Sequence, residues 1–205
     1  AHKVGGPKGI GALVVRGDAE VVPVLRGGGQ EAERRSGTPN VAGAVGFAAA
    51  LAATVAEREV VAGRVEALAA RLRAGLLGAV ADLVVTTPAA PEDRLPSILH
   101  VCVPGVDREA LLFLLDDAGV AASWGASCAS GAAEPSHVLF AMGVAPDLAA
   151  GGLRLSLGRT TTEAEIDLAV EAVAAAVPRL RGDASARVAS PRAAAGRAGV
   201  EGAAT

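Results

Sequence analysis

Two side chains in this sequence are of types that form covalent bonds with cofactors or substrates: Lys3 and Cys128. Lys3 follows His2 and precedes a glycine-rich turn, and a lysine in such a place can form a Schiff base with a carbonyl cofactor. Cys128 lies in SWGASCASG, where no bulky neighbour shields a thiol from substrate. Each residue alone has an ordinary interpretation as well, a solvated surface lysine and a small buried thiol.

Two further groups have the chemistry to bind anions. Arg154 and Arg159 occur in LRLSLGR, and an arginine on one face of a strand suits bidentate binding of a carboxylate. A structural ion pair is an equally good explanation. Thr38 closes an SGT string whose hydroxyl and backbone N–H groups could hold a phosphate. Cys102, inside SILHVCV, fits a buried apolar residue, and the two cysteines indicate neither a disulfide nor a zinc site, so no metal is expected.

The pattern of apolar residues predicts alternating strands and helices, and therefore an α/β or α+β domain. Asp107 is a plausible helix N-cap, Gly119 a helix end, and Thr162 with Glu165 a capping box. The long loop at 25–40 is more typical of function than of connection. The expected strands are 10–16, 83–86, 97–103, 120–123 and 153–157, and the expected helices are 41–77, 106–119, 135–142 and 162–177.

The amino-acid composition limits the classes of protein to which this chain can belong. The 205 residues are 51% hydrophobic and 20% charged, with a net charge of −3, which predicts a folded globular chain with no basic surface for nucleic acid. The longest apolar stretches, 41–56 and 169–178, fall short of the ~20 residues that a membrane span needs. We therefore expect no membrane partner and a reducing, cytoplasmic location. Residues 182–205, without apolar periodicity, are expected to form a disordered tail.

Four blocks in order, AHKVGGPKGIGALVVR, GGGQE with RRSGTPN, SCASGAAEPSHVL and LRLSLGRTTTEAEID, resemble signature segments of the NifS/IscS-like cysteine desulfurases. These pyridoxal 5'-phosphate (PLP) enzymes belong to the class V aminotransferase group of fold type I. The resemblance covers residues 1 to about 180. It implies an α/β fold in which residues 1–57 end the large PLP-binding domain and residues 58–181 form a small α/β domain carrying the cysteine.

The resemblance also implies a role for each candidate residue. Lys3 matches the lysine that holds PLP, and His2 the neighbouring histidine that helps to bind its phosphate. Thr38 matches the threonine that reaches the phosphate bound by the partner subunit, which implies a homodimer. Cys128 matches the nucleophile that takes sulfur from L-cysteine as a persulfide, leaving L-alanine. Arg154 matches the arginine that binds the substrate carboxylate.

In this family the persulfide sulfur passes to an acceptor protein, such as an iron–sulfur cluster scaffold or a tRNA-thiolation protein. We expect this chain to be the C-terminal portion of such an enzyme and inactive alone, because other cofactor-binding residues of the family precede the lysine. Two alternatives stay open. One is a related enzyme, a selenocysteine lyase or a class V aminotransferase. The other is a non-catalytic module for dimerisation or acceptor docking.

Overall fold

The computed structural model describes residues 1–125 and 136–189, of which 183–189 are described by their backbone alone. The chain divides into two compact units, Ala1–Val61 and Ala62–Thr205. One long helix, α1 (Val41–Ala79), continues from the first unit into the second. The expected domain boundary, between residues 57 and 58, falls close to this division, and the assignment of the two parts to domains remains a prediction.

The first unit contains little regular structure before α1. Two short 3-10 turns, η1 (His2–Val4) and η2 (Gln30–Glu33), are separated by irregular chain. The strand expected at residues 10–16 does not form, so that prediction was wrong. A strand needs a neighbour for its backbone N–H and C=O groups, and the described part of this unit contains no other strand. Leu13 and Val14 are accordingly exposed.

A three-stranded antiparallel sheet forms the centre of the second unit. Its strands β1 (Val84–Val85), β2 (Ile98–Cys102) and β3 (Gly152–Ser156) lie in the order β1-β2-β3. The register places His100 opposite Arg154 and Val101 opposite Leu153. Because successive side chains of a strand point to opposite faces, His100 and Arg154 share one face of the sheet, while Val101 and Leu153 share the other. The strand expected at 120–123 is reduced to a single bridge between Ser123 and Arg154.

Two helices of this unit begin at the caps that the sequence predicts. Asp107 caps α2 (Arg108–Asp117) by accepting a hydrogen bond from the Ala110 N–H at 2.8 Å. Thr162 and Glu165 form a reciprocal capping box at the start of α5 (Glu163–Ala189). Because α5 continues to Ala189, residues 183–189 are helical rather than part of a disordered tail, and residues 190–205 lie outside the described chain. Two short helices, α3 (His137–Ala141) and α4 (Pro146–Ala149), complete the unit.

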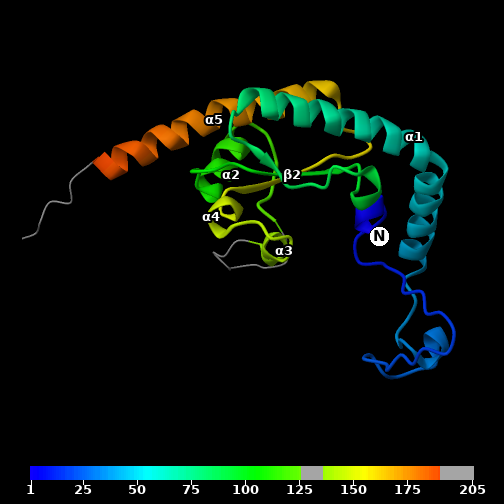
Figure 1. Cartoon of the computed structure of the whole chain (residues 1–205). Coiled ribbons are helices and arrows are strands. Elements are labelled where there is room, and N and C mark those ends of the chain that lie inside the picture. Colours follow the sequence, from blue (N-terminus) through cyan, green and yellow to red (C-terminus); the bar gives the residue numbers. More distant parts are fainter. Residues whose placement is uncertain (126–135, 190–205) are drawn as a thin grey trace, which may run out of the picture. The chain divides into compact units, whose positions relative to one another are not determined.

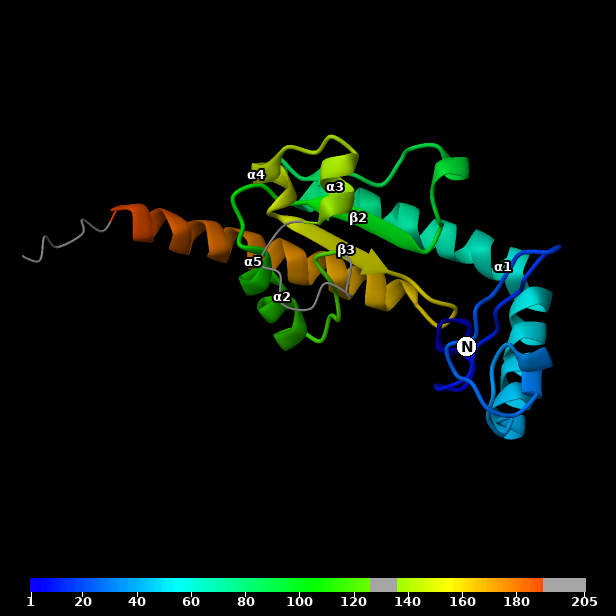
Figure 2. The same ribbon diagram turned by 90° about the horizontal axis from the view of Figure 1, so that it is seen from below.

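Within the second unit, the end of α1 and the start of α5 pack side by side on one face of the sheet, with α3 on the opposite side (Figures 1 and 2). Gly75 of α1 allows the two helices to approach, since a Cβ at this position would lie 2.7 Å from Val170 Cγ2. Leu72, Leu76 and Val173 are fully buried here together with side chains of the sheet. This core holds the strand that carries Arg154 in a fixed position.

By length and composition α1 is apolar enough to cross a membrane, which corrects the expectation drawn from residues 41–56 alone. The helix is longer than that apolar stretch, and it carries on through residues 57–79. Only 6% of its most apolar window is buried, unlike a typical core helix, but a single helix of this kind is weak evidence of a membrane span. Its passing the criterion therefore does not by itself indicate a membrane protein.

Candidate active site

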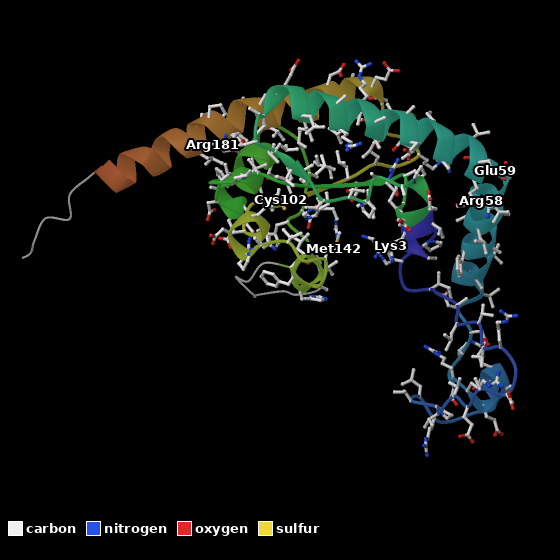
Figure 3. The ribbon with its side chains drawn as sticks, in the orientation of Figure 1. Lys3, Arg58, Glu59, Cys102, Met142 and Arg181 are labelled. Carbon is white, nitrogen blue, oxygen red and sulfur yellow. The ribbon has the colours of Figure 1, made fainter. Side chains whose placement is uncertain are left out.

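Lys3 lies on the turn η1, which backbone hydrogen bonds and one side chain of α1 hold in place (Figure 3). The carbonyl of Ala1 accepts the N–H groups of Val4 at 3.1 Å and Gly6 at 3.0 Å. The Thr54 hydroxyl, from the first-unit part of α1, donates to the Val4 carbonyl at 3.3 Å. The residue after the lysine is thus tied to a long helix, which restricts the position of the lysine backbone.

The side chains of His2 and Lys3 are both exposed. The described residues give Lys3 no ion-pair partner, so its amine is not committed to a carboxylate within this part of the chain. An exposed primary amine next to an imidazole is a donor set that suits an aldehyde cofactor carrying a phosphate. In this respect, the residues fit PLP.

Thr38 follows a loop whose shape is fixed by its own polar groups. Ser36 Oγ donates to the Gly28 carbonyl at 2.6 Å, and the Gly37 N–H donates to Gln30 Oε1 at 3.2 Å. Gly37 has φ of 117°, a conformation that side chains rarely adopt, which explains a glycine in front of the threonine. Thr38 itself is exposed and lies in the same unit as Lys3.

Arg154 is the candidate residue that the structure positions most firmly. It lies in the middle of β3, opposite His100 of β2 on one side. On the other side it exchanges two backbone hydrogen bonds with Ser123, one of 3.1 Å and one of 2.5 Å. The chain that leads toward Cys128 is therefore attached to the strand at the arginine itself. Arg159, the second arginine of this motif, is exposed in the loop after β3.

His100 and Arg154 line the same cavity, which has a volume of about 280 Å³. Its wall also includes Thr86 and side chains of α3. Gly125 and Ser136, which flank residues 126–135 in the sequence, line it as well. Next to it, the Arg108 guanidinium stacks on the Trp124 ring at 5.4 Å from the ring centroid, which anchors the residue before Gly125.

Burial and charge set the protonation of His100. Its removal from water and the positive charge of Arg154 lower the pKa of His100 below the usual value for histidine. The His100 Nδ1 lies 2.6 Å from the Thr86 hydroxyl. A neutral imidazole next to an arginine avoids placing two positive charges in one partly buried site.

The two cysteines differ in what the structure says of them. Cys128 lies outside the described residues, so its role as a nucleophile remains a prediction. Cys102 is fully buried at the end of β2, packed with Leu139 and Ala149 (Figure 3). Burial raises the pKa of the Cys102 thiol, which makes it a poorer nucleophile and agrees with a packing role.

His100 and Thr86 were not singled out by the sequence analysis. A signal for His100 was present, because a histidine interrupts the apolar residues of SILHVCV at the position that faces away from the core. Thr86 could not be found in this way, because its contact with His100 depends on strand pairing. Among the described residues, no cluster could hold a metal ion.

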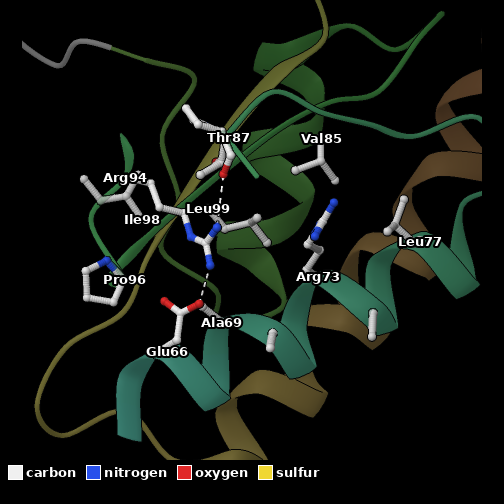
Figure 4. A pocket seen from close by; sticks show the side chains of 13 residues that line it. Glu66, Ala69, Arg73, Leu77, Val85, Thr87, Arg94, Pro96, Ile98 and Leu99 are labelled. Carbon is white, nitrogen blue, oxygen red and sulfur yellow. Dashed lines mark hydrogen bonds and ion pairs between the residues drawn. The ribbon is translucent and has the colours of Figure 1, made fainter. Parts of the chain in front are cut away.

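A second cavity, of about 230 Å³, lies on the other side of β2 and contains none of the candidate residues (Figure 4). Arg94 crosses its rim, where it donates to Glu66 and to the carbonyl groups of Pro88 and Ala89. These bonds tie the loop before β2 to α1. We interpret this cavity as part of the scaffold.

The fold agrees with comparisons to known proteins. Residues 1–169 match the family described as aminotransferase class-V, and the chain belongs to this family. The computed structure superimposes on a protein titled NifS-like with a TM-score of 0.76 and 35% identity, covering 87% of this chain and 45% of that one. A NifS-like protein from Rickettsia africae ESF-5 gives a TM-score of 0.65 at 28% identity, over 76% of this chain and 39% of that one. The expected fold class, part of a fold-type I α/β enzyme, is thereby confirmed.

Among curated relatives, an IscS-like cysteine desulfurase of Mycobacterium tuberculosis (strain ATCC 25618 / H37Rv) is 46% identical over 180 residues. That alignment covers 88% of this chain and 46% of the relative. The cysteine desulfurase NifS of Azotobacter vinelandii is 41% identical over 180 residues, covering 88% of this chain and 44% of the relative. The chain thus spans slightly less than half the length of these relatives.

Proposed function

We propose that this chain is part of a PLP-dependent cysteine desulfurase that converts L-cysteine to L-alanine and leaves the sulfur on Cys128 as a persulfide. The observation that carries the proposal is the cavity lined by Arg154, Gly125 and Ser136. Arg154, which we propose to bind the carboxylate, lines it together with the two residues that flank the segment containing Cys128. Cys128 is three residues from Gly125, a span of at most about 11 Å for extended chain. The names of the relatives support the same activity.

In this proposal each residue has a distinct task. Arg154 binds the substrate α-carboxylate and so fixes the amino acid relative to the nucleophile. The Cys128 thiolate attacks the substrate sulfur, forming an S–S bond as the Cβ–S bond breaks. The electron pair of that bond stays with the carbon, which takes up a proton to give L-alanine. The Lys3 amine moves protons at the substrate carbon atoms.

His2 and Lys3 would hold PLP, with Lys3 as the covalent attachment and Thr38 binding the phosphate held by a partner subunit. When bound, the cofactor supplies an electron-withdrawing ring that accommodates the electron pair of the bond being broken. Thr38 lies at the end of a fixed loop and is exposed, as a residue that reaches across a homodimer interface would be. We place the enzyme in the cytoplasm, where it would pass sulfur to an iron–sulfur scaffold or a tRNA-thiolation protein.

The test uses the complete polypeptide that carries this chain, loaded with PLP. L-cysteine and a reductant should yield equal amounts of L-alanine and sulfide. Cys128→Ala should reduce this yield by more than about 10-fold, because no nucleophile remains to accept the sulfur. The control Cys102→Ala removes the buried thiol and should retain the activity.

The same assay distinguishes the alternatives. If Cys128→Ala retains full sulfur transfer, the assignment of Cys128 as the nucleophile is wrong. Turnover of selenocysteine but not of L-cysteine would indicate a selenocysteine lyase. Exchange between an amino acid and a keto acid, without sulfide, would indicate an aminotransferase. Failure to bind PLP, measured as the absence of an absorbance band near the visible range, would indicate a non-catalytic module.

A further inference from the structure

His100 is placed to act on the same ligand group as Arg154. The two residues lie directly opposite each other on neighbouring strands, share one face of the sheet and line one cavity. The His100 Nε2 atom is buried and makes no hydrogen bond of good geometry within the described structure, although the Trp124 backbone interacts with the ring. A buried polar atom without a partner costs free energy, so a ligand that supplies the partner is stabilised at this position.

The neighbouring groups determine which ring nitrogen carries the proton. The His100 backbone carbonyl already accepts the N–H groups of Thr86 at 3.0 Å and Thr87 at 3.3 Å, which occupy its two lone pairs. The Thr86 hydroxyl lies 2.6 Å from Nδ1 and 3.2 Å from this carbonyl oxygen, and we assign its proton to the shorter contact, with Nδ1 as the acceptor. With the hydroxyl donating to Nδ1, the assigned proton of the neutral ring lies on Nε2, which is then a hydrogen-bond donor.

The glycine of the adjacent strand keeps a side chain away from Nε2. A Cβ on Gly152 would lie 3.4 Å from His100 Nε2 and 3.3 Å from Cε1. A side chain of any size at position 152 would therefore crowd this nitrogen. Gly152 is two residues from Arg154 and lies on the same face of β3.

We infer that His100 is a second binding residue for the substrate carboxylate, donating Nε2–H to one oxygen while Arg154 binds the other. The inference rests on the proposed function for the identity of the ligand, an α-amino acid. A carboxylate is an acceptor at both oxygens and can take donors from an arginine and an imidazole together. A neutral donor adds a hydrogen bond without adding a second buried charge, which the lowered pKa of His100 supports.

The first experiment follows the imidazole nitrogens of the complete ¹⁵N-labelled polypeptide that carries this chain, by NMR during titration with L-alanine. The His100 Nε2 signal should shift and saturate. Ethylamine, which is L-alanine without its carboxylate, should leave it unchanged. His137 is exposed on α3 and serves as the internal control. A His100 signal that does not respond to L-alanine, or that responds equally to ethylamine, would overturn the inference.

The second experiment compares variants at this position. His100→Phe removes the donor and should weaken L-alanine binding by about 10-fold or more, the value of one hydrogen bond to a charged group. His100→Gln keeps an N–H near the position of Nε2 and should bind within about 3-fold of the parent chain. The matched control is His137→Phe, which should bind as the parent does. Equal binding by His100→Phe and the parent would refute the role.

The two proposals fail in different ways. If the PLP-loaded polypeptide forms no L-alanine from L-cysteine while L-alanine still shifts His100, the desulfurase proposal is wrong and the carboxylate site stands. If sulfur is released but His100 does not sense L-alanine, the desulfurase proposal stands and the assignment of His100 is wrong. Backbone amide spectra of each variant show whether it has kept its fold, and the titration of the parent chain decides the inference even where a variant has not.

Discussion

The two units of this chain differ in where their apolar side chains lie. Among the residues that the structure describes, every buried apolar side chain lies at position 65 or later in the sequence. The first unit instead exposes Leu13, Val14, Val22, Val24, Leu25, Val41, Val45, Leu51, Val55 and Val60. The second unit therefore has a core of its own, and the first does not.

This difference shows which of the proposed site residues are preorganised by the chain itself. Arg154 and His100 lie on strands that are packed against Leu72, Leu76 and Val173, so their positions follow from burial. Lys3 is held by hydrogen bonds of a short turn. Hydrophobic burial is the main source of folding free energy. We therefore expect the carboxylate site to be the more stable part of this chain.

The largest expected difference in stability between the two units comes from the same leucine-to-alanine substitution made at two places on α1. Leu72→Ala, at 1% exposure in the second unit, should lower the free energy of unfolding by about 2–5 kcal/mol, because it leaves a cavity in the core. Leu51→Ala, at 46% exposure in the first unit, should change it by about 0.5 kcal/mol or less. Urea unfolding followed by circular dichroism measures both.

Both variants replace a leucine of α1 by alanine, so the change in helix propensity is the same in each and cancels when their unfolding free energies are compared. Equal losses for Leu51→Ala and Leu72→Ala would show that the first unit has a core as well, contrary to the contrast drawn between the units.

A smaller effect is expected at the two helix starts. Asp107 Oδ1 accepts the Ala110 N–H at 2.8 Å in the second unit, and Asn40 Oδ1 accepts the Gly43 N–H at 2.9 Å in the first. Asp107→Ala should lower the free energy of global unfolding by about 1 kcal/mol. Asn40→Ala removes the same kind of bond, yet it should only fray the first turn of α1, since no buried core depends on that turn.

Hydrogen exchange separates these outcomes. Faster exchange confined to the first turn of α1 is expected for Asn40→Ala, whereas Asp107→Ala should speed exchange throughout the sheet. A lower urea midpoint for Asn40→Ala would show that the two units unfold together.

Local signals in the sequence predicted the second unit well. Asp107 and the pair Thr162 and Glu165 begin helices as expected, since a cap depends only on residues three positions apart. β2 and β3 were found because their apolar residues fill a core. The same reasoning failed at residues 10–16, whose apolar run has no strand beside it in the described chain. Apolar composition signals burial, but a strand also requires a partner.

The candidate site shows the same limit. Arg154 could be selected from its residue type and its strand, and it does line a cavity. His100 was overlooked because its importance arises from the register that places it opposite Arg154, and from the Thr86 hydroxyl at Nδ1. Register between strands more than 50 residues apart cannot be read from either strand alone.

The smallest effect is a dependence of stability on pH that belongs to the second unit. Arg181 donates to both Asp82 oxygens, at 2.8 and 2.9 Å, and this hydrogen bonding lowers the pKa of Asp82 below its usual value. A carboxyl group whose pKa is lower in the folded state stabilises the fold above its unfolded pKa, and the contribution is lost as pH falls through the folded pKa. Asp82→Asn should therefore flatten the acid side of the stability curve, measured by urea unfolding at several pH values.

Glu59→Gln, which removes a 3.9 Å contact with Arg58 within one exposed turn of α1, should leave that curve unchanged. An unchanged acid side of the curve in Asp82→Asn would show that the Asp82–Arg181 ion pair does not contribute to the stability of the second unit.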